Sequence, residues 1–230
     1  ETIILDSLQI ALETDFILTG NHDISNRVGQ TSSLQLLGEI AKSVRIGPPN
    51  EPHISRFGAT NTAFFACHHV LTQELFEQQL DLVEQQAPTT PSFRVLLLHC
   101  NYDLSFEQGS ATLNLTRERA HQLLHHFHYI FLGHEHTHRT DFDGRLCVIG
   151  SWRPTAFDNL DDKFVIELDT EAGTYEKKLV WSAQQHVYRG PVSGATEAQG
   201  KQYYLLEDDT DDPGAAQKVV VELFEQGAFG

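Results

Sequence analysis

Three apolar segments of the chain each end in residues that can bind a metal ion. They are Phe-Ile-Leu-Thr-Gly-Asn-His-Asp at 16–23, Val-Leu-Leu-Leu-His at 95–99 and Tyr-Ile-Phe-Leu-Gly-His-Glu-His at 129–136. Short apolar runs predict buried strands, and polar residues just beyond such strands lie on loops at the edge of the sheet, where sites are often built. The three segments together therefore predict a metal centre.

The donor atoms in these segments are nitrogen and oxygen. Asn21 offers a carbonyl oxygen, and His99, His134 and His136 offer imidazole nitrogens. If the backbone of His134 and His136 is extended, their side chains project to the same side and can bind neighbouring ions. Such a ligand set without thiolate suits manganese, iron or zinc.

Each segment has a simpler interpretation when it is taken alone. His134 and His136 can be exposed loop histidines, because the chain contains 13 histidines and chance pairs occur. Gly-Asn-His-Asp can be a tight turn, since Gly and Asn favour positive φ, and His99 can be a core histidine. All three segments in this order are hard to obtain by chance.

These motifs resemble those of the calcineurin-like metallophosphoesterases. Gly-Asn-His-Asp, the strand that ends in His99 and Gly-His-Glu-His are similar to three motifs of that superfamily. Residues 114–136 and Gly-Ser-Trp-Arg-Pro-Thr-Ala-Phe at 150–157 look most like phage and bacterial relatives of the SbcD-type DNA-repair exonucleases. The resemblance covers roughly residues 1–180.

The resemblance implies two divalent metal ions, with manganese as the first expectation and iron or zinc as alternatives. Asn21, His99 and His134 match the ligands of one metal, and His136 matches a ligand of the other. Two such ions would hold a phosphate for in-line attack by hydroxide.

The resemblance also implies catalytic residues. His22 matches the residue that contacts the scissile phosphate and protonates or stabilises the leaving oxygen, and Asp23 matches the carboxylate that orients it. Physical chemistry agrees, because an imidazole beside two cations loses its proton unless a carboxylate compensates.

The family's first two motifs, Asp-x-His and Gly-Asp, do not occur in this sequence. The chain starts at Glu1 with a segment in which Leu5, Leu8 and Leu12 have helical spacing. We expect either that a βαβ unit of roughly 30 or more residues precedes this helix, or that modified methionines are missing from a sequence that contains none.

Apolar periodicity predicts alternating strands and helices. The expected strands are Phe16–Gly20, Thr62–Cys67, Arg94–His99, Tyr129–Gly133, Arg145–Gly150, Phe164–Asp169 and Lys177–Trp181, and the expected helices lie at 34–44, 76–87 and 120–127. Short turns such as Asp143-Gly144 predict hairpins after His136. The fold class is therefore α/β, and the resemblance implies a four-layer αββα metallophosphoesterase sandwich that lacks its first βαβ unit.

The sequence predicts two regions. Residues 1–181 form the metallophosphoesterase domain, and 182–230 form a linker and C-terminal extension, with a reduced capping region as one option. Val219–Phe224 is interpreted as a last strand, and the acidic run Glu207–Asp212 as a solvated loop.

The remaining histidines have ordinary interpretations. His125, His126 and His128 are expected at a helix end, where a cation favours the dipole. His68 and His69 follow a strand and could approach the site, although we favour a loop pair. His138 continues the alternation of His134 and His136 and fits either a substrate contact or a solvent-facing position.

Composition fits a globular, cytoplasmic protein. Hydrophobic residues make up 40% of 230 positions, and no apolar run reaches the length of about 18 residues that a membrane span needs. Cys67, Cys100 and Cys147 lie in or beside apolar strands, so we expect buried reduced thiols.

The expected activity is metal-dependent DNA cleavage by an SbcD-like nuclease, with an SbcC-like ATPase as a partner and a homodimer as an option. Two alternatives stay open: a phosphoesterase for small nucleotides or phosphoproteins, and a non-catalytic binding protein with a degenerate site. The net charge of −16 disfavours DNA binding, unless local cations compensate. The candidates for such a cluster are Arg27, Arg117, Arg119, Arg139 and Arg153.

Overall fold

The computed structural model describes residues 16–23, 51–58, 61–87, 93–103, 112–155, 159–198, 200–207 and 209–228. The helices expected before Phe16 and at 34–44 lie outside these ranges. The chain divides into two compact units, one of residues 1–151 with 166–176 and the other of residues 152–165 with 177–230. The domain boundary expected after residue 181 stays a prediction.

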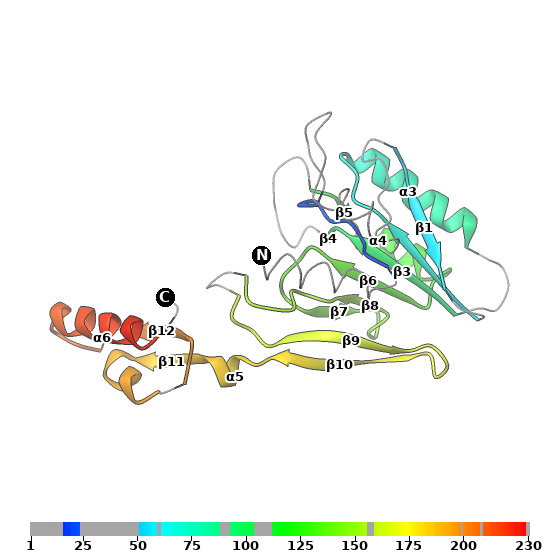
Figure 1. Ribbon diagram of the computed structural model, residues 1–230. Helices are drawn as coiled ribbons and strands as arrows, with labels where there is room; N and C mark the ends of the chain where they lie inside the picture. The colour runs from blue at the N-terminus through cyan, green and yellow to red at the C-terminus, as the bar shows by residue number, and fades with distance from the viewer. Residues whose placement is uncertain are drawn as a thin grey trace, which may run out of the picture. The chain divides into compact units, whose positions relative to one another are not determined.

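The first unit contains a six-stranded mixed sheet, so the α/β class is confirmed (Figure 1). In spatial order its strands are β1 (Ile54–Phe57), β2 (Thr62–Cys67), β3 (Phe93–His99), β6 (Tyr129–Gly133), β8 (Leu146–Val148) and β7 (Arg139–Asp141). The four central strands are parallel, whereas β1 and β7 run antiparallel at the two edges. Parallel strands place all their carboxyl ends at one edge of the sheet, and this arrangement positions the candidate site.

Two helices cover one face of this sheet. α3 (Gln73–Gln86) and α4 (Arg117–Leu123) begin after Thr72 and Thr116, whose hydroxyl oxygens accept hydrogen bonds from backbone N–H groups of the first turn. Alternate strand residues, such as Phe65, pack against the apolar side of these helices. A short parallel pair, β4 (Asn101–Tyr102) and β5 (Asn114–Leu115), lies between β3 and α4 in the chain.

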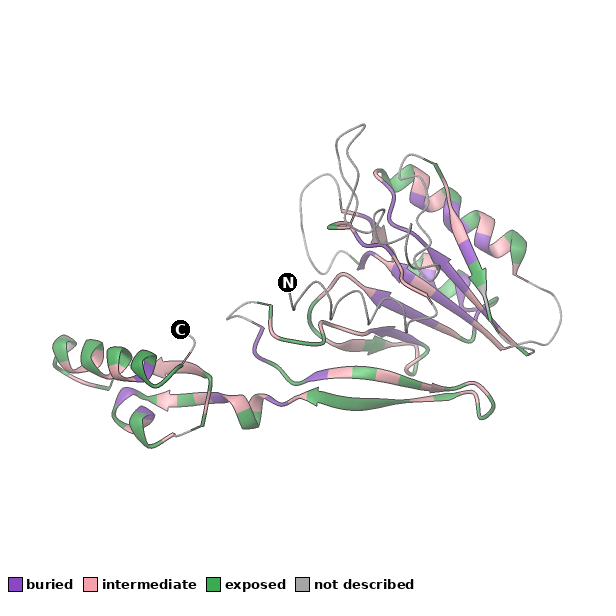
Figure 2. Ribbon diagram, viewed as in Figure 1, coloured by how far each residue is buried: buried purple, intermediate pink, exposed green. Residues whose placement is uncertain are grey.

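On the opposite face of the sheet, side chains of the central strands pack against one end of the hairpin formed by β9 and β10. Val95, Phe131 and Cys147 contact a group that includes Ile166 of β9 (Lys163–Asp169) and Tyr175 of β10 (Thr174–Trp181). The central strands are therefore buried on both faces (Figure 2). The three cysteines are buried and free, as expected.

The second unit is smaller and contains α5 (Ala183–His186), β11 (Val187–Pro191), η1 (Val192–Glu197), β12 (Tyr203–Glu207) and α6 (Pro213–Glu225). β11 and β12 are parallel. The strand expected at Val219–Phe224 is wrong, because this segment belongs to α6. Asp212 caps the helix by accepting a hydrogen bond from the Gly214 N–H, and Pro213 opens it. Part of the linker and extension expected at 182–230 is instead a strand, β11, followed by the 3₁₀ helix η1.

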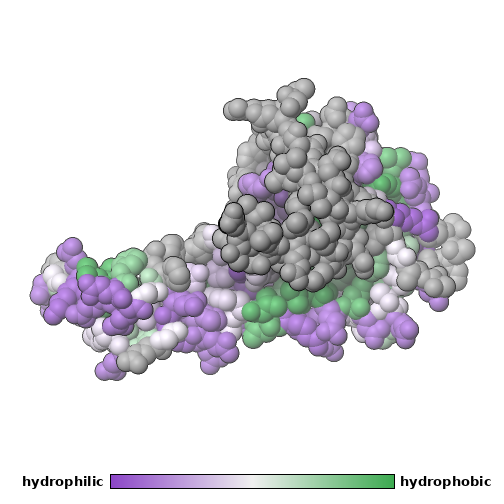
Figure 3. Space-filling model, viewed as in Figure 1, coloured by the Kyte–Doolittle hydropathy of each residue, from purple (hydrophilic) through white to green (hydrophobic). Residues whose placement is uncertain are grey.

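Some large hydrophobic side chains remain exposed in this unit. They include Leu179 and Val180 on β10 and Val221 and Phe224 on α6. In Figure 3, hydrophobic surface is visible over the β9–β10 hairpin and on α6. No helix within the described ranges is long and apolar enough to cross a membrane.

Candidate metal centre

Three neighbouring parallel strands end side by side at the carboxyl edge of the sheet. Cys67 of β2 pairs with Leu98 of β3, and His99 of β3 pairs with Gly133 of β6. The chain therefore brings His99 next to the loop that begins at His134, although 35 residues separate them in sequence. The 16–23 segment reaches the same edge, where the His69 N–H donates to the Thr19 carbonyl over 3.2 Å.

The His99 ring lies between two glycines. A Cβ atom on Gly20 would lie 2.7 Å from His99 Cε1, and one on Gly133 would lie 3.1 Å from His99 Nδ1. A side chain at Gly20 would thus displace the imidazole. The glycines of Gly-Asn-His-Asp and Leu-Gly-His are therefore needed for close approach to this ring.

Asn21 approaches the other nitrogen of His99. Its Oδ1 atom lies 3.0 Å from His99 Nε2, a contact between residues 78 positions apart. The strand expected at Phe16–Gly20 forms only a single bridge, at Ile17, and a turn follows at Asn21. Asp23 closes this turn, because its Oδ2 accepts a hydrogen bond from the Gly20 N–H at 2.8 Å. Its expected contact with the exposed His22 stays a prediction.

His134 follows β6 in a left-handed conformation, with φ of 93°. The backbone is therefore not extended at His134, so the condition under which His134 and His136 would project to the same side is not met. The rings of His134 and His99 are 5.2 Å apart. His134 Nε2 is buried and has no hydrogen-bond partner among the described residues.

The His134–His136 loop is attached to β4 by Glu135 and Arg139. The Arg139 guanidinium donates to both Glu135 oxygens, each over 2.9 Å, and also to the Tyr102 carbonyl over 2.6 Å. Glu135 Oε1 in turn accepts from the Tyr102 N–H at 2.7 Å. The sequence placed Arg139 only in a candidate cationic cluster and predicted no role for Glu135. The one sequence signal for their pairing is an acidic residue four positions before an arginine.

Burial favours the neutral form of His99 and His134. Together with the neighbouring His134 and His69, it lowers the pKa of His99 to about 3. Burial also lowers the pKa of His134, whereas the Glu135 carboxylate opposes that change. A neutral imidazole has a free lone pair, which is the form that binds a metal ion.

His69 is a site neighbour that the sequence did not favour. Its ring lies edge-on to the His99 ring, with 6.3 Å between the centroids. Burial and, to a lesser extent, His134 lower the pKa of His69 to about 4, against the opposing effect of a hydrogen bond to the His99 backbone. The signal in the sequence is the same one that identified His99, namely a histidine after an apolar strand.

The donor chemistry at this edge suits a divalent transition metal. His134 has a buried imidazole nitrogen with no hydrogen-bond partner among the described residues, and His99 contacts the amide oxygen of Asn21. Imidazole nitrogen and amide oxygen are donors that such metals accept. No group of three or more His, Cys, Asp or Glu side chains within the described ranges is close enough to hold a metal by itself. The fit therefore depends on Asn21 as well as the histidines.

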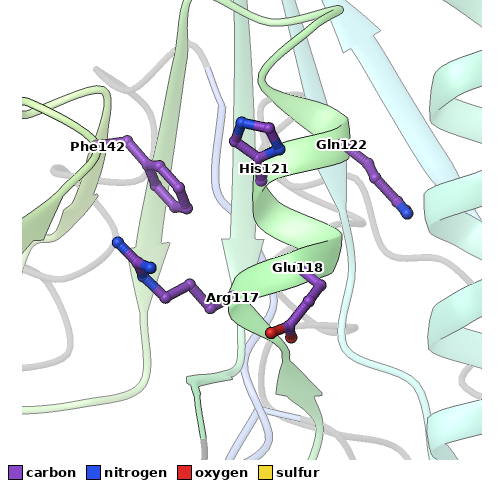
Figure 4. A pocket seen from close by; sticks show the side chains of 5 residues that line it. All are labelled: Arg117, Glu118, His121, Gln122 and Phe142. Atoms are coloured by element: carbon purple, nitrogen blue, oxygen red, sulfur yellow. The ribbon is translucent and has the colours of Figure 1, made fainter.

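A separate open pocket of about 340 Å³ lies beside α4 (Figure 4). It is lined by Arg117, Glu118, His121, Gln122 and Phe142. The Arg117 guanidinium lies over the Phe142 ring, 5.0 Å from its centroid. None of the predicted site residues lines this pocket.

Neither a protein-family model nor a curated protein sequence matches the chain.

Proposed function

We propose that the protein is a metal-dependent phosphodiesterase of the calcineurin-like metallophosphoesterase superfamily, with DNA as its substrate. The observation that carries the proposal is the meeting of three sequence segments at one sheet edge. Asn21 Oδ1 lies 3.0 Å from His99 Nε2, and the His99 and His134 rings are 5.2 Å apart. These are the residues whose motifs resemble one metal-ligand set of that superfamily.

The layers of the first unit support the fold that this proposal requires. A helical layer, a six-stranded mixed sheet and the tip of the β9–β10 hairpin pack in succession. We propose that they belong to a four-layer αββα sandwich.

Asn21, His99 and His134 would hold one divalent cation, and His136 would contribute to a second. Manganese is the first expectation, with iron or zinc as alternatives. Bound cations of this kind stabilise charge on phosphoryl oxygens and lower the pKa of water. Gly20 and Gly133 leave room for the His99 ring, while Glu135 and Arg139 fix the loop of His134 and His136.

His22 would assist departure of the leaving group. It is exposed beside Asn21, and its charge lowers the pKa of His99, so it lies close to the proposed ligands. As water attacks phosphorus and the bond to the leaving oxygen breaks, the His22 ring N–H donates a proton to that oxygen. Asp23 closes the turn that carries His22.

A second candidate, hydrolysis of small phosphoesters, is favoured by the net charge of −16. DNA binding normally depends on Lys and Arg contacts, so a DNA substrate implies cationic help from a partner such as an SbcC-like ATPase. A small phosphoester needs no such surface.

Two histidine variants separate metal binding from turnover. In the full-length protein, His134→Ala should lose metal, because it removes a ligand. His22→Ala should keep metal, while manganese-dependent DNA cleavage falls by roughly 10²–10⁴-fold, the usual contribution of a positioned acid. Elemental analysis and single-turnover cleavage measure the two effects.

His125→Ala serves as the control, because His125 is exposed beyond α4, and both readouts should be unchanged. Equal metal loss in the His22 and His134 variants would place His22 among the ligands. Wild-type protein that binds no manganese and cleaves neither DNA nor a small phosphodiester would overturn the proposal.

A further inference from the structure

His69 lies inside the carboxyl edge of the sheet. β2 and β3 are parallel neighbours, and His69 lies two residues past β2, while His99 ends β3. The His69 backbone N–H donates to the Thr19 carbonyl over 3.2 Å, and its ring meets the His99 ring at an interplanar angle of 87°. Only 7% of the residue is exposed. His69 is therefore an interior residue of the candidate site, and not the loop residue that the sequence favoured.

The neighbours of the His69 ring belong to the candidate site. The charges of His134 and His22 both lower the pKa of His69, so these two side chains lie close to it. Within the described ranges, no three His, Cys, Asp or Glu side chains are close enough to hold a metal ion, so His69 does not join His99 and His134 as a ligand. The ring is thus beside the proposed metal ligands and the proposed acid, with a role other than coordination.

Only one nitrogen of the His69 ring has a partner. The ring makes a hydrogen bond to the His99 backbone that raises the pKa of His69, which is the effect of donating to a carbonyl oxygen. Nδ1 is buried and has no hydrogen-bond partner among the described residues, so the donor is Nε2. Burial lowers the pKa of the ring to about 4, and the ring is neutral at pH 7. Nδ1 therefore carries a lone pair and no hydrogen.

A buried lone pair requires a hydrogen-bond donor. Buried polar atoms in proteins are normally paired, and an unpaired one calls for a specific explanation. The phosphate oxygens of a phosphodiester carry no hydrogen, so they cannot be the partner of Nδ1. The oxygen that attacks phosphorus in the proposed reaction does carry hydrogen, whether it enters as water or as hydroxide.

We propose that His69 Nδ1 accepts a hydrogen bond from the oxygen that attacks phosphorus and thereby orients it. The inference rests on the proposed function, because it assumes that phosphodiester hydrolysis takes place at this edge. A hydrogen held by Nδ1 points away from phosphorus and leaves a lone pair of the same oxygen free to form the new bond. When that bond forms, this hydrogen stays on the oxygen, and the leaving oxygen takes its proton from His22. A second hydrogen, which only water carries, is lost to solvent.

The first test is the tautomer of His69. ¹⁵N NMR of full-length protein labelled at histidine, without metal and at neutral pH, distinguishes protonated from unprotonated ring nitrogens. Nδ1 of His69 should be unprotonated and Nε2 protonated, and the spectrum of His69→Asn assigns the two signals. A protonated Nδ1 would overturn the proposal, because it has no lone pair with which to accept a hydrogen bond.

The second test separates orientation of the attacking oxygen from metal binding. His69→Leu removes the acceptor, whereas His69→Asn keeps an oxygen near the position of Nδ1. Both variants should retain the manganese content of the wild type. In His69→Leu, kcat should fall roughly 10–10²-fold with KM unchanged, and His69→Asn should recover most of the loss. If His69→Leu does not fold, the tautomer of the wild type still decides the question.

His128→Leu is the matched control, because it makes the same change at a histidine whose Nδ1 already accepts from the Arg94 N–H at 3.1 Å. It should leave kcat unchanged. An unchanged kcat in His69→Leu, or loss of manganese from it, would overturn the orienting role and leave the proposed phosphodiesterase intact. If wild-type protein bound no manganese and hydrolysed no phosphodiester, the proposed function would fail, and the orienting role would fail with it.

Discussion

Adjacent histidines at the end of β2 have opposite environments. His68 lies between the hydroxyl groups of Thr19 and Ser55, whereas His69 faces His99 with one unpaired nitrogen. The first arrangement ties the 16–23 segment and β1 to the end of β2, and the second places the His69 ring beside the His99 ring. Of the two histidines, His68 alone therefore has both ring nitrogens in hydrogen bonds.

His68 should make stability depend on pH. Burial and, to a lesser extent, the charge of His53 lower its pKa to about 4, while an unfolded histidine titrates near 6.5. Between these values the unfolded chain binds a proton that the folded chain does not. The contribution of His68 is therefore present above about pH 6.5 and is lost as the pH falls toward 4, by up to about 3 kcal/mol.

Urea denaturation of wild type and His68→Gln at several pH values tests this expectation. The variant should be less stable at pH 7 and should lose less additional stability on acidification. Because His69 and His99 also have lowered pKa values, both proteins retain some pH dependence, and the difference between them isolates His68. Parallel stability curves from pH 7 to pH 4 would contradict the assignment.

At the scale of elements, the loop after β6 has one residue in an unfavourable backbone conformation and is attached to β4 by several hydrogen bonds. His134 has a positive φ, which is uncommon for a residue with a bulky side chain. Glu135, with 9% of its side chain exposed, holds Arg139 and the Tyr102 N–H. Arg139 also lies over the Tyr102 ring, 4.9 Å from its centroid. These contacts with β4 stabilise the conformation that turns His134 toward His99.

Glu135→Gln should loosen this anchor. The amide keeps the size of the side chain but removes the charge and one acceptor, so the free energy of unfolding should fall by roughly 1–3 kcal/mol. Mn²⁺ affinity should fall as well, because His134 is held less firmly. Chemical denaturation and calorimetry measure the two effects.

Glu222→Gln provides the comparison, since the Lys218–Glu222 pair on α6 spans 3.9 Å and is exposed. Its loss should change stability by less than about 0.5 kcal/mol. If Glu135→Gln had no larger effect than Glu222→Gln, the proposed anchoring role would be wrong.

Apolar runs in the sequence predicted the buried central strands correctly, but they did not predict every element. The bounds of Thr62–Cys67 and Tyr129–Gly133 are confirmed, because each is a continuous apolar run in a buried strand. β1 was missed, since Ile-Ser-Arg-Phe at an antiparallel edge contains no apolar run. The strand expected at Val219–Phe224 was wrong because β-branched residues outweighed the helix-start signals at Asp212 and Pro213.

The candidate site could be predicted only in part. Motif spacing identified Asn21, His99 and His134, which the sheet brings to one edge. The same patterns could not separate His69 from His68, because the distinction depends on which side chains pack around each ring. The left-handed turn at His134 is likewise fixed by tertiary contacts.

At the scale of the whole molecule, charge opposes the expected substrate. The chain has 16 Lys and Arg against 32 Asp and Glu. Three arginines that were expected to attract DNA are paired with carboxylates in the structure: Arg117 with Asp141, Arg119 with Asp81 and Glu84, and Arg139 with Glu135. Arg153 lies over the Trp152 ring, and Arg27 lies outside the described residues. The expected cationic cluster is therefore largely neutralised where it is described.

The protein alone should consequently bind duplex DNA weakly, and its binding should fall steeply as salt rises. If DNA is the substrate, manganese-dependent cleavage of DNA at low salt should exceed hydrolysis of a generic small phosphodiester. Full-length protein is assayed on both substrates across a salt series, with Arg119→Gln as a control that should leave DNA affinity unchanged, because Arg119 is already paired with acidic residues. Efficient hydrolysis of the small ester or of cyclic nucleotides, with no DNA cleavage at low salt, would reject the nuclease in favour of the small-phosphoester enzyme.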